Sequence, residues 1–207
     1  MPNPMSSTRQ ALLRTLKRER LHIEPSALER SPGPVRRHFA HAWAPADLLL
    51  SLLAAWPLGL IAFWLAAPAG HIVFSAGPSA YLPTAMPWRS GSLLAVARLS
   101  LADLLEPRAS LTLIAHLMDH LLGSRGAPDG PWLSDGAGCT PNLAAVGQKL
   151  SPLASLGYGP TEPHAYFAWA FAGYWLDRRA LNAADPHVEH LLRTTLCNDG
   201  FWKRANG

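Results

Sequence analysis

Charged residues and cysteines are both scarce in this chain. Asp, Glu, Lys and Arg together make up 15% of it, against about a quarter in an average globular protein. The chain has two cysteines, Cys139 and Cys197, and no CxxC pair. A disulfide framework and a zinc site built from cysteine pairs are therefore excluded, and we expect reduced thiols in a cytoplasmic protein unless the fold brings the two together.

Several motifs that mark cofactor sites and nucleophiles are also missing. The glycine-rich segment 134–138 lacks the GxGxxG spacing of dinucleotide-binding loops, and no Lys-Ser/Thr pair follows it as in a phosphate-binding loop. No GxSxG occurs, and neither cysteine lies in a known nucleophile motif. No apolar stretch closely follows the first basic residues, so we expect no secretory signal peptide. We therefore expect no nucleotide or other organic cofactor.

The residues that are abundant indicate one domain made of short elements. The chain has 207 residues, of which 49% are hydrophobic and eight are tryptophan, enough for one well-buried aromatic core. Nineteen prolines and sixteen glycines imply many breaks between elements. We expect a mainly α-helical α+β domain over residues 41–207, preceded by a basic, weakly structured leader over residues 1–40.

The positive charge is concentrated in that leader. Residues 1–40 contain eight Lys and Arg against three Glu, whereas the rest of the chain is close to neutral. Such a segment suits an anionic partner or is simply a solvated terminus. Because no aromatic residues interleave the early basic cluster, nucleic acid is not an expected partner, whereas a membrane surface stays open.

The longest uncharged stretch allows two interpretations. No Asp, Glu, Lys or Arg occurs from Leu48 to Trp88, and residues 48–67 form a run of twenty residues with one hydroxyl. That length suits a single membrane-spanning helix, and the upstream basic residues fit the positive-inside rule. Pro57 and Gly59 instead predict two short buried helices, and we prefer this interpretation.

Periodicity and breakers predict the remaining elements. We expect strands at residues 71–75 and 80–82, and either a strand or a helix within 92–105. A helix is expected over 111–122 with Gly123 as its stop, followed by a long polar loop over 124–142. Further helices are expected over the ranges 143–150, 164–176 and 186–196.

One predicted helix carries two histidines at a spacing that suits a metal. His116 and His120 are four residues apart, so both rings leave the same helix face. Two imidazoles placed in this way can hold one zinc ion, as in the HExxH helix of zinc peptidases. Asp119 faces roughly the same way and is a candidate ligand, orienting partner or base. However, Leu117 stands where HExxH has its glutamate, and the alternative is that both histidines are structural.

The same helix and the aromatic segment after it resemble the catalytic domain of the anthrax lethal factor-like metallopeptidases. That family has a helix of the form H-E-x-x-H-x-x-D and a later aromatic helix containing E-x-F-A. The corresponding segments here are IAHLMD at residues 114–119, HAYFAWAF at residues 164–171, and a helix start at Asp185-Pro186. The likeness covers about residues 45–200 and implies a zincin-like fold, a zinc cofactor, and a peptide substrate along the edge of a small sheet.

In the register of that family, most of the catalytic residues are missing. Thr112 and Leu113 occupy the positions of the first histidine and the glutamate, and His116 matches the second histidine. The glutamate ligand of the aromatic helix would fall at Ala165. In this register the chain has lost its catalytic apparatus.

A second register keeps a metal site. If His116 and His120 are the pair, Glu162 or His164 would be the third ligand, and Asp119 or Glu162 would polarise the water. The sequence therefore predicts a zinc metallopeptidase-like protein, active or degenerate, with a peptide or protein as its substrate or partner. The alternatives are a non-catalytic protein-binding domain that uses the loop 124–142, and a single-pass membrane protein anchored by residues 48–67.

Overall fold

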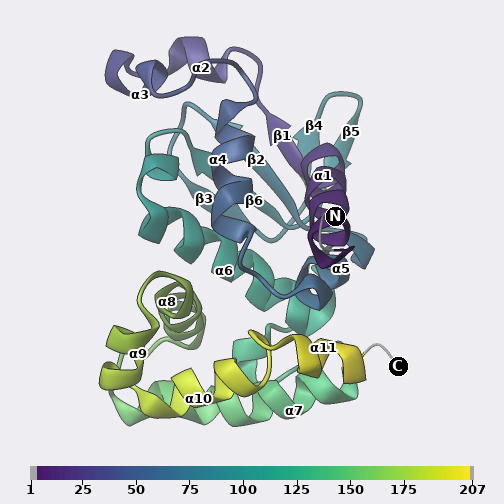
Figure 1. The fold of residues 1–207 in the computed structure, drawn as a ribbon, viewed down its shortest axis with the longest axis vertical. Helices are drawn as coiled ribbons and strands as arrows, with labels where there is room; N and C mark the ends of the chain where they lie inside the picture. Colours follow the sequence, from purple (N-terminus) through teal and green to yellow (C-terminus); the bar gives the residue numbers. More distant parts are fainter. Residues whose placement is uncertain (1–3, 206–207) are drawn as a thin grey trace.

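A four-stranded mixed sheet organises the first half of the chain. The structure is a computed structural model and describes residues 4–205 (Figure 1). The strands are β1 (Leu21–Ile23), β2 (His71–Ser75), β3 (Ala80–Leu82) and β6 (Val96–Ser100), in the order β1-β2-β6-β3. The β1–β2 and β2–β6 pairs are parallel, and β3 joins β6 antiparallel at one edge. The hairpin of β4 (Met86–Trp88) and β5 (Gly91–Leu93) forms a separate two-stranded sheet.

Helices account for most of the rest, so the predicted mainly helical α+β class is confirmed. The first half holds α1 (Pro4–Arg20), α2 (Ala27–Arg30), α3 (Gly33–Arg37), α4 (Ala44–Leu53) and α5 (Leu58–Ala66). The second half holds α6 (Pro107–Ser124), α7 (Pro141–Leu150), α8 (Pro163–Leu176), α9 (Arg178–Ala184), α10 (Pro186–Thr194) and α11 (Asp199–Ala205). Short 3₁₀ turns lie at Asp103–Leu105, Leu133–Asp135 and Ser151–Leu156. Proline is the first residue of four of the later helices, where its missing N–H costs nothing.

The uncharged stretch 48–67 forms two helices and not one. A break at Trp56 and Pro57 separates α4 from α5, as the proline predicts. Trp56, Leu60 and Trp64 are fully buried. Within residues 4–205 no helix combines the length and the apolar character that crossing a membrane requires. The alternative of one spanning helix over 48–67 is therefore not realised.

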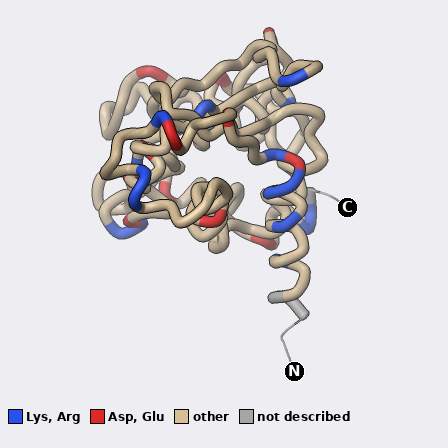
Figure 2. Tube along the Cα trace, turned by 90° about the horizontal axis from the view of Figure 1, so that it is seen from above, with Lys and Arg blue, Asp and Glu red and all other residues tan. Residues whose placement is uncertain are grey.

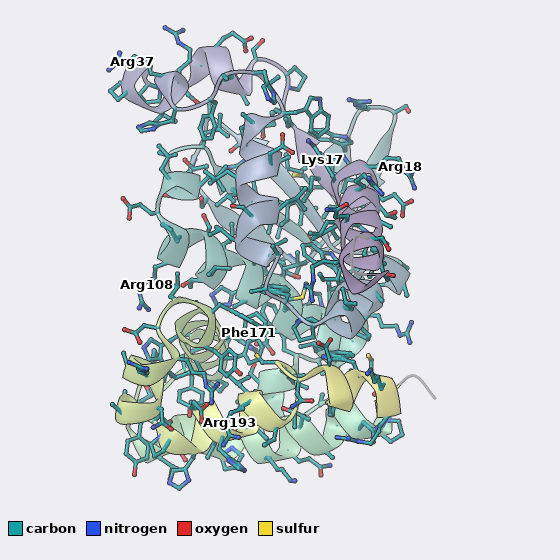
Figure 3. The ribbon with its side chains drawn as sticks, viewed as in Figure 1. Lys17, Arg18, Arg37, Arg108, Phe171 and Arg193 are labelled. Carbon is teal, nitrogen blue, oxygen red and sulfur yellow. The ribbon has the colours of Figure 1, made fainter. Side chains whose placement is uncertain are left out.

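The central element is α6, which joins the sheet to the helical second half. It packs against β6 and β3 on one side and against α8 on the other, and its residues from Leu117 to Gly123 are all buried. In Figure 3 Phe171 points from α8 into the interior, where its ring meets Trp56 edge-on at 5.2 Å between centroids. One continuous aromatic core thus holds both halves of the domain together.

The basic segment at the start of the chain is more ordered than its composition suggests. Its helix α1 buries Leu16, and β1 is the edge strand of the sheet beside β2. Arg9 donates hydrogen bonds to the carbonyls of Ala54 and Trp56 at 2.7 and 2.6 Å, just beyond the end of α4. Charge in this segment therefore stabilises helix ends of the uncharged stretch; Figure 2 marks the Lys and Arg positions along the chain in blue.

Arg20 has the same function at the end of α5. Its Nη2 lies 2.8 Å from the carbonyl oxygen of Leu65 and 2.5 Å from that of Ala67. Both carbonyls belong to the last turn of α5 and the residue after it, where no further helical N–H follows to satisfy them.

Removing the Arg20 guanidinium should destabilise the domain. We expect Arg20→Met to lower the free energy of unfolding by about 2 kcal/mol, because two carbonyls lose a charged donor. Arg18→Met is the matched control, since Arg18 is largely exposed and pairs only with Glu19 at the surface. It should change stability by less than about 0.5 kcal/mol. Urea unfolding of the three proteins measures both values, and equal losses would contradict the capping role.

Candidate functional site

The residues that the sequence singles out lie together around one indole ring. His116, His120 and Asp119 come from α6, and His164 comes from the first turn of α8. Trp132, in the loop between α6 and α7, has its ring centre 4.3 Å from that of His164, 5.0 Å from that of His120 and 6.3 Å from that of His116. Three histidines therefore surround a tryptophan that the sequence analysis had not selected.

A buried carboxylate is the polar centre of this cluster. Asp119 is fully buried, and its Oδ1 accepts a hydrogen bond from the backbone N–H of Ser134 at 2.8 Å. Its Oδ2 lies 2.6 Å from Ser134 Oγ, which in turn lies 2.8 Å from His164 Nδ1. The network ties α6, the 3₁₀ turn at Leu133–Asp135 and the start of α8 to one another.

These contacts fix the direction of each hydrogen bond. The Asp119 carboxylate can only accept, so the Ser134 hydroxyl donates to it, and the remaining bond must run from His164 Nδ1–H to Ser134 Oγ. In a serine hydrolase the order is different, because histidine lies between serine and aspartate and accepts the hydroxyl proton. Ser134 is also almost fully buried. The three residue types of a catalytic triad are present, but the arrangement cannot activate the serine.

His120 has both of its ring nitrogens in use. Nε2 lies 2.7 Å from the carbonyl oxygen of Ala127 and so carries the hydrogen, and Nδ1 lies 2.6 Å from the Tyr81 hydroxyl. Burial lowers the pKa of His120, so the ring is neutral and Nδ1 accepts from the tyrosine. The Trp132 ring stacks on its face at an interplanar angle of 15°. In this arrangement His120 offers no nitrogen to a metal ion.

The other predicted ligands do not complete a metal site. Glu162 is the N-cap of α8, where its two carboxylate oxygens accept from the backbone N–H groups of His164 and Ala165 at 3.0 and 2.6 Å. His116 is half-buried beside Trp132. Within residues 4–205 no group of three or more His, Cys, Asp or Glu side chains is placed to hold a metal ion. As these side chains are placed, they form no three-ligand site for zinc among the described residues.

The acid–base properties of the cluster follow from burial and from Asp119. Burial raises the pKa of Asp119, and the hydrogen bonds from His164 and Ser134 oppose this shift. The Asp119 carboxylate, whose Oδ2 lies 3.5 Å from His164 Nδ1, raises the pKa of His164, against the effect of burial. Burial lowers the pKa of His116, and the charge of nearby His164 adds to the decrease. These shifts favour a positive charge on His164, next to the buried Asp119.

The His164 charge predicts a pH-dependent contribution to stability. Because the folded-state pKa of His164 is raised, its stabilisation is complete below the unfolded value of about 6.5 and is lost as pH rises through the folded value. We expect His164→Gln to be less stable than the wild type at pH 6 and the difference to shrink by pH 9. Urea unfolding at pH 6 and at pH 9 tests this. The control is His190→Gln, at an exposed histidine of α10. A difference that is independent of pH would contradict the charged pair.

Sequence reasoning missed three residues that build this site. Trp132 and Ser134 belong to the loop 124–142, where glycines and prolines indicate turns and give no sign of burial. Tyr81 comes from β3, more than thirty residues before its partner His120. The SDG sequence at residues 134–136 was the only local signal, since Asp135 Oδ2 accepts a hydrogen bond from the backbone N–H of Trp132 at the start of the turn.

Comparison with protein families, with curated proteins and with solved structures finds no match to this chain.

Proposed function

We propose that this chain is a catalytically degenerate zincin-like domain that binds an extended segment of a partner protein. The resemblance in sequence supports the zincin-like fold, as does the placement of an antiparallel edge strand, β3, against the helix α6 that carries the histidines. The two free cysteines are compatible with the cytoplasm, where we place the protein.

One observation carries the proposal: the polar groups at the centre of the site are satisfied by the protein itself. Asp119 accepts from Ser134 twice, and both nitrogens of His120 are bonded. A catalytic group has to be available to the substrate or to water, and a carboxylate held in this way is not. In the family's register the positions of the first histidine and the glutamate hold Thr112 and Leu113, and Leu113 is buried in the core. The site therefore supports a binding role better than hydrolysis.

The free edge of β3 supports an extended peptide as the partner. Strand β3 pairs with β6 on one side, and within residues 4–205 no strand pairs with its other side. An unpaired strand edge presents backbone N–H and C=O groups that a peptide can join by strand addition. All three residues of β3 are half-buried, and Tyr81 is fixed by its hydrogen bond to His120, so this edge is rigid before binding.

Metal content and peptidase activity test the loss of catalysis. We expect freshly purified wild-type protein to carry no stoichiometric zinc and to cleave a fluorogenic peptide library no faster than His116→Ala and His120→Ala. Near one zinc per wild-type chain, lost in both variants, would establish the two-histidine site and overturn the degenerate assignment. Thermal unfolding of each variant shows whether it is folded before the comparison is made.

A selection from a peptide display library tests the binding role. We expect peptides from the selection to slow hydrogen exchange at the Tyr81 amide, whose N–H faces the free edge of β3, and to lose affinity when Tyr81 is replaced by proline, which removes that N–H. Leu156→Ser, at an exposed leucine far along the chain, is the control that should keep full binding. Selected peptides that bind a folded Tyr81→Pro variant as tightly as the wild type would overturn strand addition at β3.

A further inference from the structure

A second cavity lies at the opposite edge of the sheet from the histidine cluster. It has a volume of about 680 Å³ and opens between β1, the segment up to Trp43 and the β4–β5 hairpin. The strand order places β1 two strands away from β6 and three from β3, so this cavity is separate from the site on α6. Its volume is within the range of about 300–1,000 Å³ that is typical of small-molecule sites.

Two tryptophans and a histidine provide flat surfaces in this cavity. Trp88 lies with its ring centre 5.5 Å from that of His22, and both line the cavity together with Trp43. Trp43 is 45% exposed, although burial of such a ring is the norm. Aromatic faces that remain accessible at the rim of a cavity favour a ligand with a planar ring.

A chain of hydrogen bonds leaves one ring nitrogen of His22 without a protein partner among residues 4–205. Arg20 Nη1 lies 3.5 Å from His71 Nε2 and can only donate, so His71 carries its hydrogen on Nδ1. His71 Nδ1 lies 3.0 Å from His22 Nε2 and donates to it. The hydrogen of His22 is therefore on Nδ1, which has no partner among residues 4–205. A histidine that lines the cavity thus offers it an unused N–H group.

Two arginine charges act on His22. Burial lowers the pKa of His22, and the charges of Arg89 and Arg20 lower it further. Two carboxylates also line the cavity: Glu24 pairs with Arg30, and Glu29 is exposed on α2. Arg18, labelled on α1 in Figure 3, adds a second guanidinium to the wall.

The backbone at Arg89 supports a role for its side chain. Arg89 has φ 50°, in the left-handed region that glycine adopts without strain, and it lies in the turn between β4 and β5. Holding an arginine there costs about 1 kcal/mol or more relative to glycine. Among residues 4–205 the Arg89 guanidinium has no hydrogen-bond or ion-pair partner. Arg89 lines the cavity, so its unpaired guanidinium is available to an anion there.

We propose that this cavity binds a small planar aromatic anion, with the ring between the tryptophans and its carboxylate or phosphate at His22 and Arg89. The site is independent of the function proposed for the β3 edge. A neutral ring would leave the cation and the N–H donor unused, and an anion without a ring would leave the tryptophan faces exposed.

Nuclear magnetic resonance titration tests the site with three anions: adenosine monophosphate, uridine monophosphate and indole-3-acetate. The indole N–H signals of Trp43 and Trp88 are assigned from Trp→Phe variants. We expect at least one anion to shift both signals with a dissociation constant below about 1 mM, an affinity ordinary for a small ligand. Adenosine has the aromatic ring without the anionic group, and inorganic phosphate is an anion without a ring. Each should bind at least about tenfold more weakly than the best anion.

Variants assign the binding to the named residues. Arg89→Gln should weaken the best anion about tenfold, and Arg89→Lys should recover part of the loss. Arg37→Gln, at the exposed end of α3 that Figure 3 labels, should bind as the wild type does. Failure of all three anions, equal binding of adenosine or of inorganic phosphate, or an affinity that Arg89→Gln leaves unchanged while the protein stays folded would each overturn the proposal.

Discussion

Replacing Asp119 by alanine is expected to lower the free energy of unfolding by about 3–5 kcal/mol. The carboxylate is fully buried and accepts two hydrogen bonds from Ser134. Its removal leaves the backbone N–H of Ser134 without a partner inside the protein and leaves a positively charged His164 beside a cavity. Because the network joins α6 to the turn at Leu133–Asp135 and to α8, the loss is global and should appear in the urea midpoint.

Two companion variants make the Asp119 result interpretable. Ser134→Ala keeps the backbone N–H bond to Asp119 and should cost only about 1–2 kcal/mol. Asp129→Ala, an exposed aspartate in the same loop, should change stability by less than about 0.5 kcal/mol. A cost below about 1 kcal/mol for Asp119→Ala would show that the network does not hold these elements together. The functional proposal would then lose its main support, because the carboxylate would be free for another role.

The elements that the sequence predicts well are those with long periodic patterns or a proline at their start. The helix expected over 111–122 is α6, the helix expected over 164–176 is α8, and the strands expected at 71–75 and 80–82 are β2 and β3. The two helices are long apolar segments that begin at a proline, and β2 is a short run of buried residues; β3, three residues long, is fixed by its pairing with β6. The range 92–105, for which the spacing of apolar residues allows a strand or a helix, contains the strand β6. Its pairing with β2 favours the strand.

The order in the basic segment could not be predicted in the same way. Its strand β1 is three residues long, too short for a periodicity, and it exists because β2 pairs with it. The carbonyls that Arg9 and Arg20 satisfy lie more than forty residues further along the chain. A count of charges indicates a solvated or anion-binding segment, whereas the contacts show that part of its charge is used within the fold.

The candidate site was predicted as a set of residues but not as a geometry. Helical spacing correctly placed His116, Asp119 and His120 on one face, and the aromatic helix brought His164 to them. Whether a ring nitrogen of His120 is free depends on its contacts with Tyr81 and with the carbonyl of Ala127. The spacing of four residues between the histidines predicts neither contact. A pair of histidines in sequence therefore identifies a location, and the hydrogen bonds of each ring decide whether a ligand is available there.

Gly123 carries the second large expected effect, for a reason that differs from its predicted role. The sequence predicts it as the stop of the helix, but α6 continues through Ser124, and the left-handed residue after the helix is Arg125. A Cβ on Gly123 would lie 2.3 Å from the carbonyl oxygen of Pro131 and 2.6 Å from backbone atoms of Trp132. The glycine is needed because the loop backbone passes directly over the helix and places Trp132 among the histidines.

We therefore expect Gly123→Ala to lower the free energy of unfolding by about 3 kcal/mol, since the added methyl meets backbone that cannot rotate away. Gly173→Ala in α8 is the matched control: its Cβ would meet Leu181 at an ordinary 3.6 Å, so the gain in helix propensity should leave stability unchanged or raise it by up to about 1 kcal/mol. Urea unfolding measures the change in the free energy of unfolding, with its sign, for each of the two variants. If Gly123→Ala also displaces the Trp132 indole from His120, the indole N–H resonance should shift as the stack is lost. Equal effects of the two substitutions would mean that the loop can move, and that Trp132 is not fixed over the site by this close approach.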